Sequence, residues 1–349
     1  MNIVKAGYEI IPELDDSLGL MKKIERIART CYKSEDLITE TSCVKMVENL
    51  IKREHFAMLE HGSLAFKVDE TSFYDTQELV IHLEKGLIRE HEYETFKSYL
   101  RFTDDKQNYI ISGNIRAWLE FLNTCIKFIG KIPPFVKTYI TTMNAINSNS
   151  DIPILFKDFI NVPDDTYVMP ASLVSVERID PVSLSVRERL IHQDLTIKFI
   201  VDRGITHELV RHRDCSFAQE STRYVNYSKE KYGSEINVIE PCFWLDKPEE
   251  YATWKNICED AEKVYINLVN NKVPPQQARN VLPTSVKSDI YMTANIREWI
   301  HILELRALGV TGKPHPQMEE VMIPLAIELV SGPLCDFTCI DSVNKMLSL

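Results

Sequence analysis

The spacing of apolar and polar positions divides the chain into short strands and amphipathic helices. Residues 63–68 place apolar side chains at every second position, which is the period of a half-buried strand. Residues 18–32 place them three and four positions apart, which is the period of a helix with one buried face. The same reading predicts strands at residues 2–11, 63–68, 195–201 and 236–239. It predicts helices at residues 18–32, 44–54, 76–84, 115–129, 134–146, 207–213, 250–270 and 321–330.

Two of these helices carry local signals. Thr206 is the expected N-cap of the helix at 207–213, because a threonine hydroxyl can accept from a free amide of the first turn. A spacing of four residues would place Glu208 beside His212 on that helix. The last predicted helix can hold Pro324 only in its first turn, because proline has no amide hydrogen for an interior hydrogen bond.

Composition narrows the class of protein. The chain has 349 residues, of which 44% are hydrophobic and 26% are charged, so it can bury a substantial core in one large domain or two. The formal net charge of −11 argues against general binding to nucleic acid through a basic surface. The first residues form no apolar signal-peptide core, and no apolar run reaches the length of a membrane span. We therefore expect a soluble, cytoplasmic protein that binds neither nucleic acid nor membrane.

The cysteines favour reduced thiols. None of the eight cysteines forms a Cys-x-x-Cys pair with another. Cys335 and Cys339 are four residues apart, but without nearby histidines they do not support a zinc site. Free thiols of a cytosolic protein are the simpler interpretation.

Residues 211–224, here called the basic stretch, concentrate side chains that bind anions. Arg211, His212 and Arg213 are consecutive, and two serines and Arg223 follow them. Guanidinium groups bind phosphate in a bidentate manner, and serine hydroxyls and backbone amides supply further donors. The basic stretch therefore predicts a local anion site in an acidic protein, although a solvated basic loop would have the same composition.

A second polar group lies just before the second predicted strand. His55 and His61 flank Glu60, which suits either a metal site or hydrogen-bonding groups around a ligand. A mononuclear zinc site needs a third protein ligand, and this segment does not supply one. If His207 and His212 joined the two histidines, the chain could be a metal-dependent hydrolase, and that function stays open as an alternative.

Residues 70–194 separate two predicted strands and contain mostly helical patterns. We interpret them as an inserted, mainly helical subdomain of unknown role. Residues 112–119 within it resemble residues 293–300, since both contain Asn-Ile-Arg-x-Trp. This similarity indicates either a partial repeat or two unrelated helix starts.

The motifs together resemble the flavin-dependent thymidylate synthases. Arg211-His212-Arg213 is followed after seven residues by Ser221 and then by Arg223, which is similar to the signature of that family. Four further segments resemble the family in the same order along the chain, at residues 28–34, 55–62, 273–283 and 295–306.

The resemblance covers about residues 1–69 and 195–349. It implies that these form a catalytic domain of α+β class, with a mixed sheet and long helices, into which residues 70–194 are inserted. It implies reductive methylation of dUMP to dTMP. Methylenetetrahydrofolate would donate the carbon, and FAD reduced by NADPH would carry the hydride, so that the protein supplies binding and orientation. It also implies a homotetramer whose active sites are shared between subunits.

The resemblance assigns roles position by position. For dUMP it implies binding by Glu208, Arg211, Gln219, Glu220, Ser221, Thr222, Arg223, Arg279 and Arg306. For FAD it implies binding by His55, Ala57, Arg211, His212, Arg213, Gln219, Asn295, Arg297 and His301. Arg306 is the implied catalytic residue, because a cation beside the uracil favours the N3-ionised ring. Ser221 and Arg223 would hold the phosphate, and no metal is implied.

Three features depart from the family pattern. Glu208 stands where a glutamine is common, Gln219-Glu220 inverts the frequent order, and Ala57 lacks the usual hydroxyl. Cys215 has arginine neighbours that could lower the pKa of a thiol, but nothing else marks it as a nucleophile. Besides the hydrolase, a non-catalytic nucleotide-binding relative stays open as an alternative.

Overall fold

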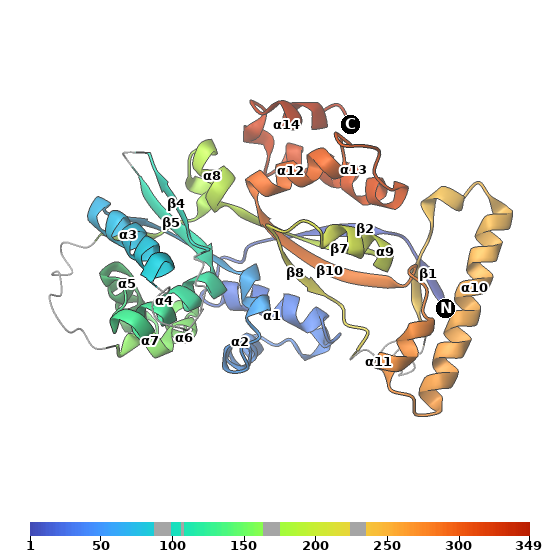
Figure 1. Ribbon diagram of the computed structural model, residues 1–349, viewed down its shortest axis with the longest axis horizontal. Coiled ribbons are helices and arrows are strands. Elements are labelled where there is room, and N and C mark those ends of the chain that lie inside the picture. The colour runs from blue at the N-terminus through green and yellow to red at the C-terminus, as the bar shows by residue number, and fades with distance from the viewer. Residues whose placement is uncertain (87–98, 106–107, 163–174, 224–234) are drawn as a thin grey trace. The chain divides into compact units, whose positions relative to one another are not determined.

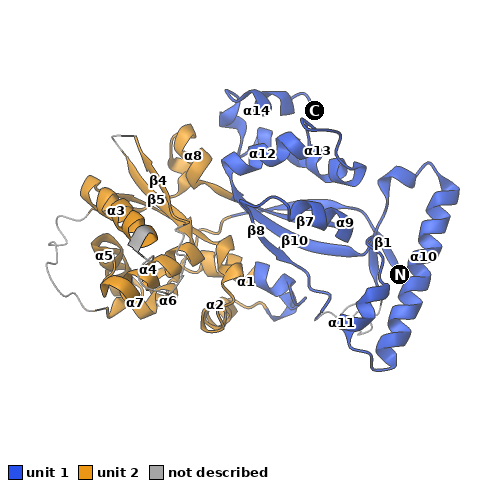
Figure 2. Ribbon diagram, in the orientation of Figure 1, with its two compact units in different colours: residues 1–12, 27–37, 195–349 blue, residues 13–26, 38–194 orange. Residues whose placement is uncertain are grey.

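The computed structural model describes residues 1–86, 99–105, 108–162, 175–223 and 235–349 (Figure 1). The chain forms two compact units, which Figure 2 colours separately. Unit 1 contains residues 1–12, 27–37 and 195–349, and unit 2 contains residues 13–26 and 38–194. Each unit combines a four-stranded sheet with helices, so the α+β class expected from the sequence is confirmed.

Unit 1 is built on a sheet with the strand order β2-β7-β10-β8. Its strands are β2 (Gly7–Ile11), β7 (Asp194–Asp202), β10 (Lys287–Asn295) and β8 (Ser216–Gln219). A separate parallel pair joins β1 (Asn2–Val4) to β9 (Asn237–Ile239). The single strand predicted at 2–11 was therefore wrong, because its two halves pair with different partners, β9 and β7.

The helices of unit 1 are α9 (Arg203–Leu209), α10 (Pro248–Asn270), α11 (Pro275–Ala278), α12 (Ile296–Arg306), α13 (Pro316–Ser331) and α14 (Asp341–Met346). α12 packs against β10, and α13 packs against both α12 and β2 (Figure 1). The buried indole of Trp299 fixes α12 to the sheet, since its Nε1 donates to the carbonyl of Leu195 at 3.0 Å. These contacts hold the C-terminal end of α12 beside the basic stretch.

The last long helix begins earlier than its apolar pattern indicated. α13 starts at Pro316, where the ring of His315 accepts from the amide of Gln317, so Pro324 lies inside the helix. The expectation that Pro324 could stand only in a first turn was wrong. The buried apolar face of α13, which includes Met318, Val321 and Leu325, outweighs the missing hydrogen bond of one proline.

Unit 2 has its own antiparallel sheet with the order β4-β5-β3-β6. Its strands are β3 (Ser63–Val68), β4 (Arg101–Asp104), β5 (Tyr109–Asn114) and β6 (Val176–Arg178). Its helices are α2 (Ser42–Lys52), α3 (Glu70–Gly86), α4 (Ile115–Ile129), α5 (Pro134–Ile146), α6 (Asp151–Leu155), α7 (Lys157–Ile160) and α8 (Val186–His192), and α1 (Gly19–Thr30) belongs partly to each unit. Phe66 of β3 packs edge-on against Trp118 of α4 within this core, with 5.3 Å between the centroids of the two rings.

The division into units differs from the predicted insert at one end. Unit 2 ends at residue 194 but also contains residues 13–26 and 38–69, so the insert at 70–194 stays a prediction. The strand at 63–68 belongs to unit 2, because β3 pairs with β5 and β6 from within the insert. Those strands were not predicted, whereas the helices at 115–129 and 134–146 have the predicted bounds. Within the described ranges, no helix is both long and apolar enough to cross a membrane.

Candidate active site

The basic stretch begins just after α9 ends. The helix spans Arg203–Leu209, so the prediction of a helix at 207–213 was wrong in its bounds. Asp202 rather than Thr206 is the N-cap, because its carboxylate accepts from the amide of Ile205 at 2.7 Å. β7 therefore passes directly into α9, and the basic residues fall in the turn that leads to β8.

Arg306, at the last position of α12, reaches the same turn. Its Nη1 donates to Oε2 of Glu208 at 3.1 Å, and its Nε donates to Nε2 of His212 at 3.2 Å. Glu208 and His212 thus lie together, but through Arg306 and not through one helix face, because α9 ends at Leu209. The side chains of Arg306 and Glu208 are 21% and 31% exposed, so water reaches this ion pair.

Arg306 and His212 line a cleft of about 330 Å³, here called the cationic cleft. Most of its residues are basic, and the whole lining is Arg211, His212, Arg213, Asp214, Glu298, His301, Leu305 and Arg306. Arg211 and Arg213 are exposed, so their guanidinium groups face solvent and can reach a ligand. The arrangement suits a phosphate-bearing ligand, because guanidinium groups form paired, charge-assisted hydrogen bonds to phosphate.

His212 is an uncharged member of this cleft. Its burial and, after that, the charges of Arg306 and His301 lower the pKa of the imidazole to about 4. At neutral pH its Nε2 can therefore accept the proton of Arg306 Nε, with the ring proton on Nδ1. His212 thus orients the guanidinium group of Arg306 and adds no positive charge of its own.

Cys215, at the edge of the cationic cleft, has the wrong environment for a thiolate. Its burial and then the negative charges of Glu298 and Asp214 raise the pKa of the thiol. Burial also raises the pKa of Glu298 itself, against the lowering effect of His301. A thiol is nucleophilic only when it is ionised, so Cys215 is poorly suited to attack a substrate at neutral pH.

A second group of predicted residues follows the far end of β8. Nη1 of Arg279 donates to Oγ1 of Thr222 at 3.0 Å, and Oγ of Ser221 accepts from the amide of Arg223 at 3.2 Å. Arg223 is exposed. The strand that separates this group from the cationic cleft is β8, and its length is roughly 10 Å at a rise of 3.3 Å per residue.

Gln219 and Glu220 have partners inside unit 1. Nε2 of Gln219 donates to the hydroxyl groups of Thr206 at 2.9 Å and Ser288 at 3.0 Å. The carboxylate of Glu220, only 1% exposed, pairs with Lys33 at 2.9 Å and Lys287 at 3.6 Å. These contacts fix the end of β8, and the nucleotide-binding roles implied for both residues stay predictions.

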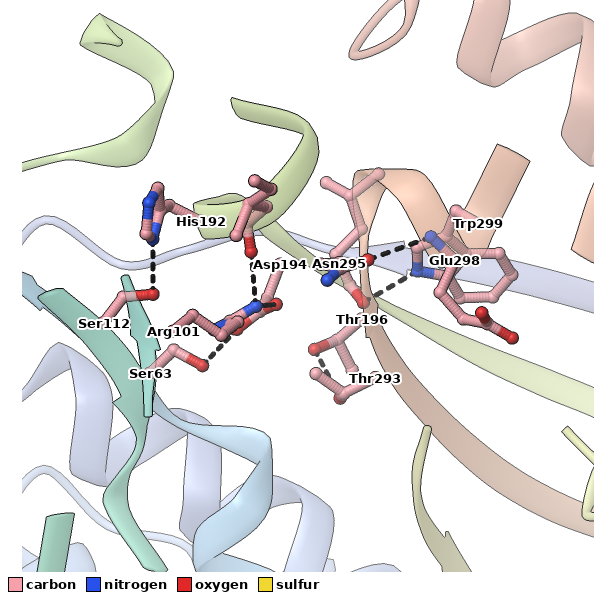
Figure 3. Close-up of polar contacts among 12 residues, drawn as sticks. Ser63, Arg101, Ser112, His192, Asp194, Thr196, Thr293, Asn295, Glu298 and Trp299 are labelled. Carbon is pink, nitrogen blue, oxygen red and sulfur yellow. Dashed lines mark hydrogen bonds and ion pairs between the residues drawn. The ribbon is translucent and has the colours of Figure 1, made fainter. Parts of the chain in front are cut away.

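Asn295 and Arg297 stand at the start of α12. The Asn295 side chain caps the helix, since its Oδ1 accepts from the amide of Glu298 at 2.9 Å (Figure 3). Arg297 is exposed on the first turn. The sequence analysis missed Glu298 as a lining residue, although it precedes His301 by three positions, which places both on one helix face.

The remaining predicted ligands of FAD lie in unit 2. His55 precedes a short 3-10 helix, Phe56–His61, and Ala57 lies within it, both exposed. Their role in binding a flavin stays a prediction. Tyr224, the last residue of the basic stretch, lies outside the described residues.

A metal centre gains no support. Among the residues that the structure describes, no group of three or more His, Cys, Asp or Glu side chains could hold a metal ion. The four histidines proposed for a hydrolase, His55, His61, His207 and His212, are all described. The hydrolase alternative is therefore not favoured.

The fold and the cationic cleft describe an α+β protein with a cleft lined mostly by basic side chains. The family model for "Thymidylate synthase complementing protein" matches residues 14–83 and 185–327, more than half of the chain, and the chain belongs to this family. The family resemblance seen in the sequence is thereby confirmed. The part left unmatched between the two ranges, residues 84–184, lies wholly inside the predicted insert at 70–194.

Curated relatives agree with this family. The chain is 34% identical over 134 residues to a flavin-dependent thymidylate synthase of Pyrococcus furiosus, covering 38% of this chain and 54% of the relative. It is 34% identical over 122 residues to one of Corynebacterium efficiens, covering 31% and 46%. The chain thus spans about half the length of the curated relatives it matches.

Solved structures give weaker similarity. A UMP/dUMP methylase, PolB from Streptomyces cacaoi, bound with 5-Br dUMP, aligns with 95% of this chain and 93% of its own at 13% identity and a TM-score of 0.39. The same protein bound with 5-Br UMP covers 40% and 69% at 21% identity and a TM-score of 0.34. These TM-scores are too low to support an argument about the fold.

Proposed function

We propose that this chain is an enzyme that methylates dUMP to dTMP reductively, with methylenetetrahydrofolate as carbon donor and FAD, reduced by NADPH, as hydride carrier. One observation carries the proposal. The whole lining of the cationic cleft, from Arg211 to Arg306, falls within the second range matched by the family model. Five of the residues that the family resemblance assigns to flavin or nucleotide line this cleft, namely Arg211, His212, Arg213, His301 and Arg306.

The chemistry of the cationic cleft fits FAD. Its pyrophosphate is an anion, and the exposed guanidinium groups of Arg211, Arg213 and Arg297 are suited to bind it. His212, Asn295 and His301 would complete the contacts of unit 1, and the family resemblance also assigns His55 and Ala57 to FAD. When bound and reduced, FAD supplies the hydride that the reaction needs.

dUMP would be held at its two ends by the two groups that flank β8. Arg223 and Ser221 would bind the phosphate, with Arg279 and Thr222 beside them. The pyrimidine would lie near Arg306, where Glu208 and Arg211 are also found.

Arg306 would be the catalytic residue at the pyrimidine. A guanidinium group next to the ring favours the N3-ionised form, which makes the ring carbon more nucleophilic. Glu208 and His212 act as positioning residues, because they fix Arg306 through Nη1 and Nε. We further propose a homotetramer in which subunits share active sites, as the resemblance implies.

The experiment is a reconstitution with isotopic carbon. Purified chain is supplied with dUMP, FAD, NADPH and ¹³C-methylenetetrahydrofolate, and dTMP is detected by mass spectrometry. Labelled dTMP should form only when all components are present, and the protein should show the visible absorption of a flavin. Absence of flavin uptake would refute the cofactor assignment, and dUMP binding without turnover would favour the non-catalytic relative. Bound zinc in a colourless protein would support the hydrolase.

A further inference from the structure

The two sheets share one arrangement of strands. Unit 2 has the order β4-β5-β3-β6, and unit 1 has the order β8-β10-β7-β2. Along the chain, β3, α3, β4, β5 and α4 follow one another in unit 2, and β7, α9, β8, β10 and α12 do so in unit 1, with β9, α10 and α11 placed between β8 and β10. The fourth strand alone differs in sequence position, because β6 follows its partners and β2 precedes them. The two units thus repeat the same topology.

The pairing registers of the hairpins also agree. In unit 2 Arg101 faces Ser112, two residues before the helix cap Asn114. In unit 1 Ser216 faces Thr293, two residues before the helix cap Asn295. Both hairpins then continue with antiparallel pairs, so β4 aligns with β8 position for position.

The fourth strands agree by an independent criterion. Lys67 of β3 faces Glu177 of β6, and Lys198 of β7 faces Glu9 of β2. Both pairs place a lysine opposite a glutamate. Each lysine also lies three residues after a leucine, Leu64 or Leu195, whose carbonyl accepts a hydrogen bond from a tryptophan indole. The fourth strand therefore stands in the same register against its neighbour in both units.

Buried side-chain contacts repeat as well. Nε1 of Trp118 donates to the carbonyl of Leu64 at 3.4 Å, as Nε1 of Trp299 does to Leu195 at 3.0 Å. Asn114 caps α4 by accepting from Ala117 at 2.8 Å, just as Asn295 caps α12 (Figure 3). Two unrelated helix starts could share a cap, but not also a tryptophan contact to the equivalent strand.

A third cap is similar in kind but not in position, because the register that equates Leu64 with Leu195 places Ile200 opposite Asp69. Asp69, at the end of β3, accepts from the amide of Ser72 at 2.8 Å. Asp202, at the end of β7, accepts from the amide three positions on, that of Ile205, at 2.7 Å. Each first strand therefore passes into its helix through a capping aspartate.

Along the described helices α4 and α12, the positions that differ include those that α12 contributes to the anion site. The counterpart of Arg306 is Cys125, which is fully buried, and the counterpart of His301 is Glu120. Arg116, the counterpart of the exposed Arg297, is held by Glu60 and Glu120, each at 2.7 Å. Carboxylates or a thiol thus replace or neutralise the cations, which disfavours an anionic ligand.

We propose that unit 2 is a degenerate internal copy of the strand-and-helix framework of unit 1, whose helix α4 has kept the framework and lost the anion-binding side chains that α12 carries, so that each chain binds one nucleotide, through unit 1. The inference that unit 2 is a copy of unit 1 rests only on the structures of the two units. The count of one nucleotide rests in addition on the proposed function.

The count is tested by calorimetric titration of the full, FAD-loaded chain with dUMP. One equivalent per chain is expected. Arg306→Ala should raise the dissociation constant for dUMP at least about tenfold, which is the effect of losing one charged contact. Cys125→Ala, at the equivalent position of unit 2, should change that constant less than twofold. Likewise, Arg297→Ala should weaken the binding of FAD, and Arg116→Ala should leave it unchanged. Binding of two equivalents of dUMP per chain, or weaker binding of dUMP or FAD by Arg116→Ala, would refute the proposal that unit 2 has lost its site.

A second measurement separates the copy from the function. If no dUMP binds at all, the proposed function fails, and the copy is then decided by a crystal structure with Trp118→Phe and Trp299→Phe as matched variants. The expected result is the same strand order in both units, with each indole on the carbonyl of the first strand and each variant lowering the melting temperature. A structure without the Trp118–Leu64 contact, or with another order of β4, β5, β3 and β6, would overturn the copy.

Discussion

Replacing Glu208 by glutamine tests how Arg306 is controlled. The carboxylate of Glu208 lies 3.1 Å from Nη1 of Arg306 and competes with any anionic ligand for that guanidinium group. Glutamine has nearly the same shape and keeps one acceptor oxygen, and it replaces the other oxygen of the carboxylate by a neutral NH2 group. It is also the residue common at this position in the family that the sequence resembles. Glu208→Gln should therefore leave Arg306 in place and make it more attractive to dUMP.

The magnitude follows from the exposure of the pair. A pair of charges this close is worth several kcal/mol at a low effective dielectric constant, but here the side chains are 21% and 31% exposed. Solvent screening reduces the worth of the ion pair to about 1 kcal/mol. If that competition is released in full, the dissociation constant for dUMP should fall by up to about fivefold. The gain should shrink at high salt, because screening weakens both the competition and the attraction.

The assay is calorimetric titration with dUMP at low and high salt, for the parent chain, Glu208→Gln and Glu208→Ala. Glu208→Ala serves as the control, because it removes both the charge and the acceptor that holds Nη1. It should lower turnover more than Glu208→Gln does. Weaker dUMP binding by Glu208→Gln would refute the reasoning, because it would mean that the carboxylate itself accepts a hydrogen bond from the nucleotide.

Four further outcomes are expected. Cys215→Ala should keep dUMP-dependent turnover, because burial raises the pKa of that thiol; loss of turnover with intact ligand binding would instead support a cysteine nucleophile. Arg223→Ala should weaken dUMP at least about tenfold in a titration and leave deoxyuridine, which has no phosphate, unchanged. Arg306→Lys should lower kcat more than it raises the dissociation constant, since lysine keeps the charge and loses the planar fork. The folded pKa of His212 is about 4 against an ordinary 6.5, so the unfolded chain takes up the proton first and the free energy of unfolding should fall from pH 6.5 to pH 4; urea titrations of His212→Gln should show a shallower fall.

The sequence predicted elements well where local signals mark their ends. The helices at 115–129 and 134–146 have the predicted bounds, because Asn114 caps the first, Gly130 ends it in a left-handed conformation and Pro134 begins the second. β8 was missed because its four residues lie in the polar basic stretch and are a strand only by pairing with β10, far along the chain. Such pairing leaves no signal in the short segment itself.

The candidate site was predicted as a set of residues and not as an arrangement. The sequence placed Glu208 and His212 together by helical spacing, whereas their contact depends on Arg306, which comes 94 positions after His212. Glu220 is a charged residue in a polar stretch, which is typical of an exposed ligand-binding side chain. Its carboxylate is nevertheless buried, where it pairs with Lys33 and Lys287. In both cases, partners that are distant in sequence determine where the side chain lies, so residue spacing alone could not predict its position.

The two Asn-Ile-Arg-x-Trp segments show why a motif alone does not identify a site. Its asparagine and tryptophan serve the same end in both units, namely to cap a helix and fix it to a sheet. What differs is the surroundings of the arginine: Arg116 lies between two glutamates, and Arg297 is exposed beside the cationic cleft. The same side chain is therefore part of a salt-bridge network in one unit and available to an anion in the other. If the proposed function holds, the charges placed around the repeated framework, and not the framework itself, would recognise the nucleotide.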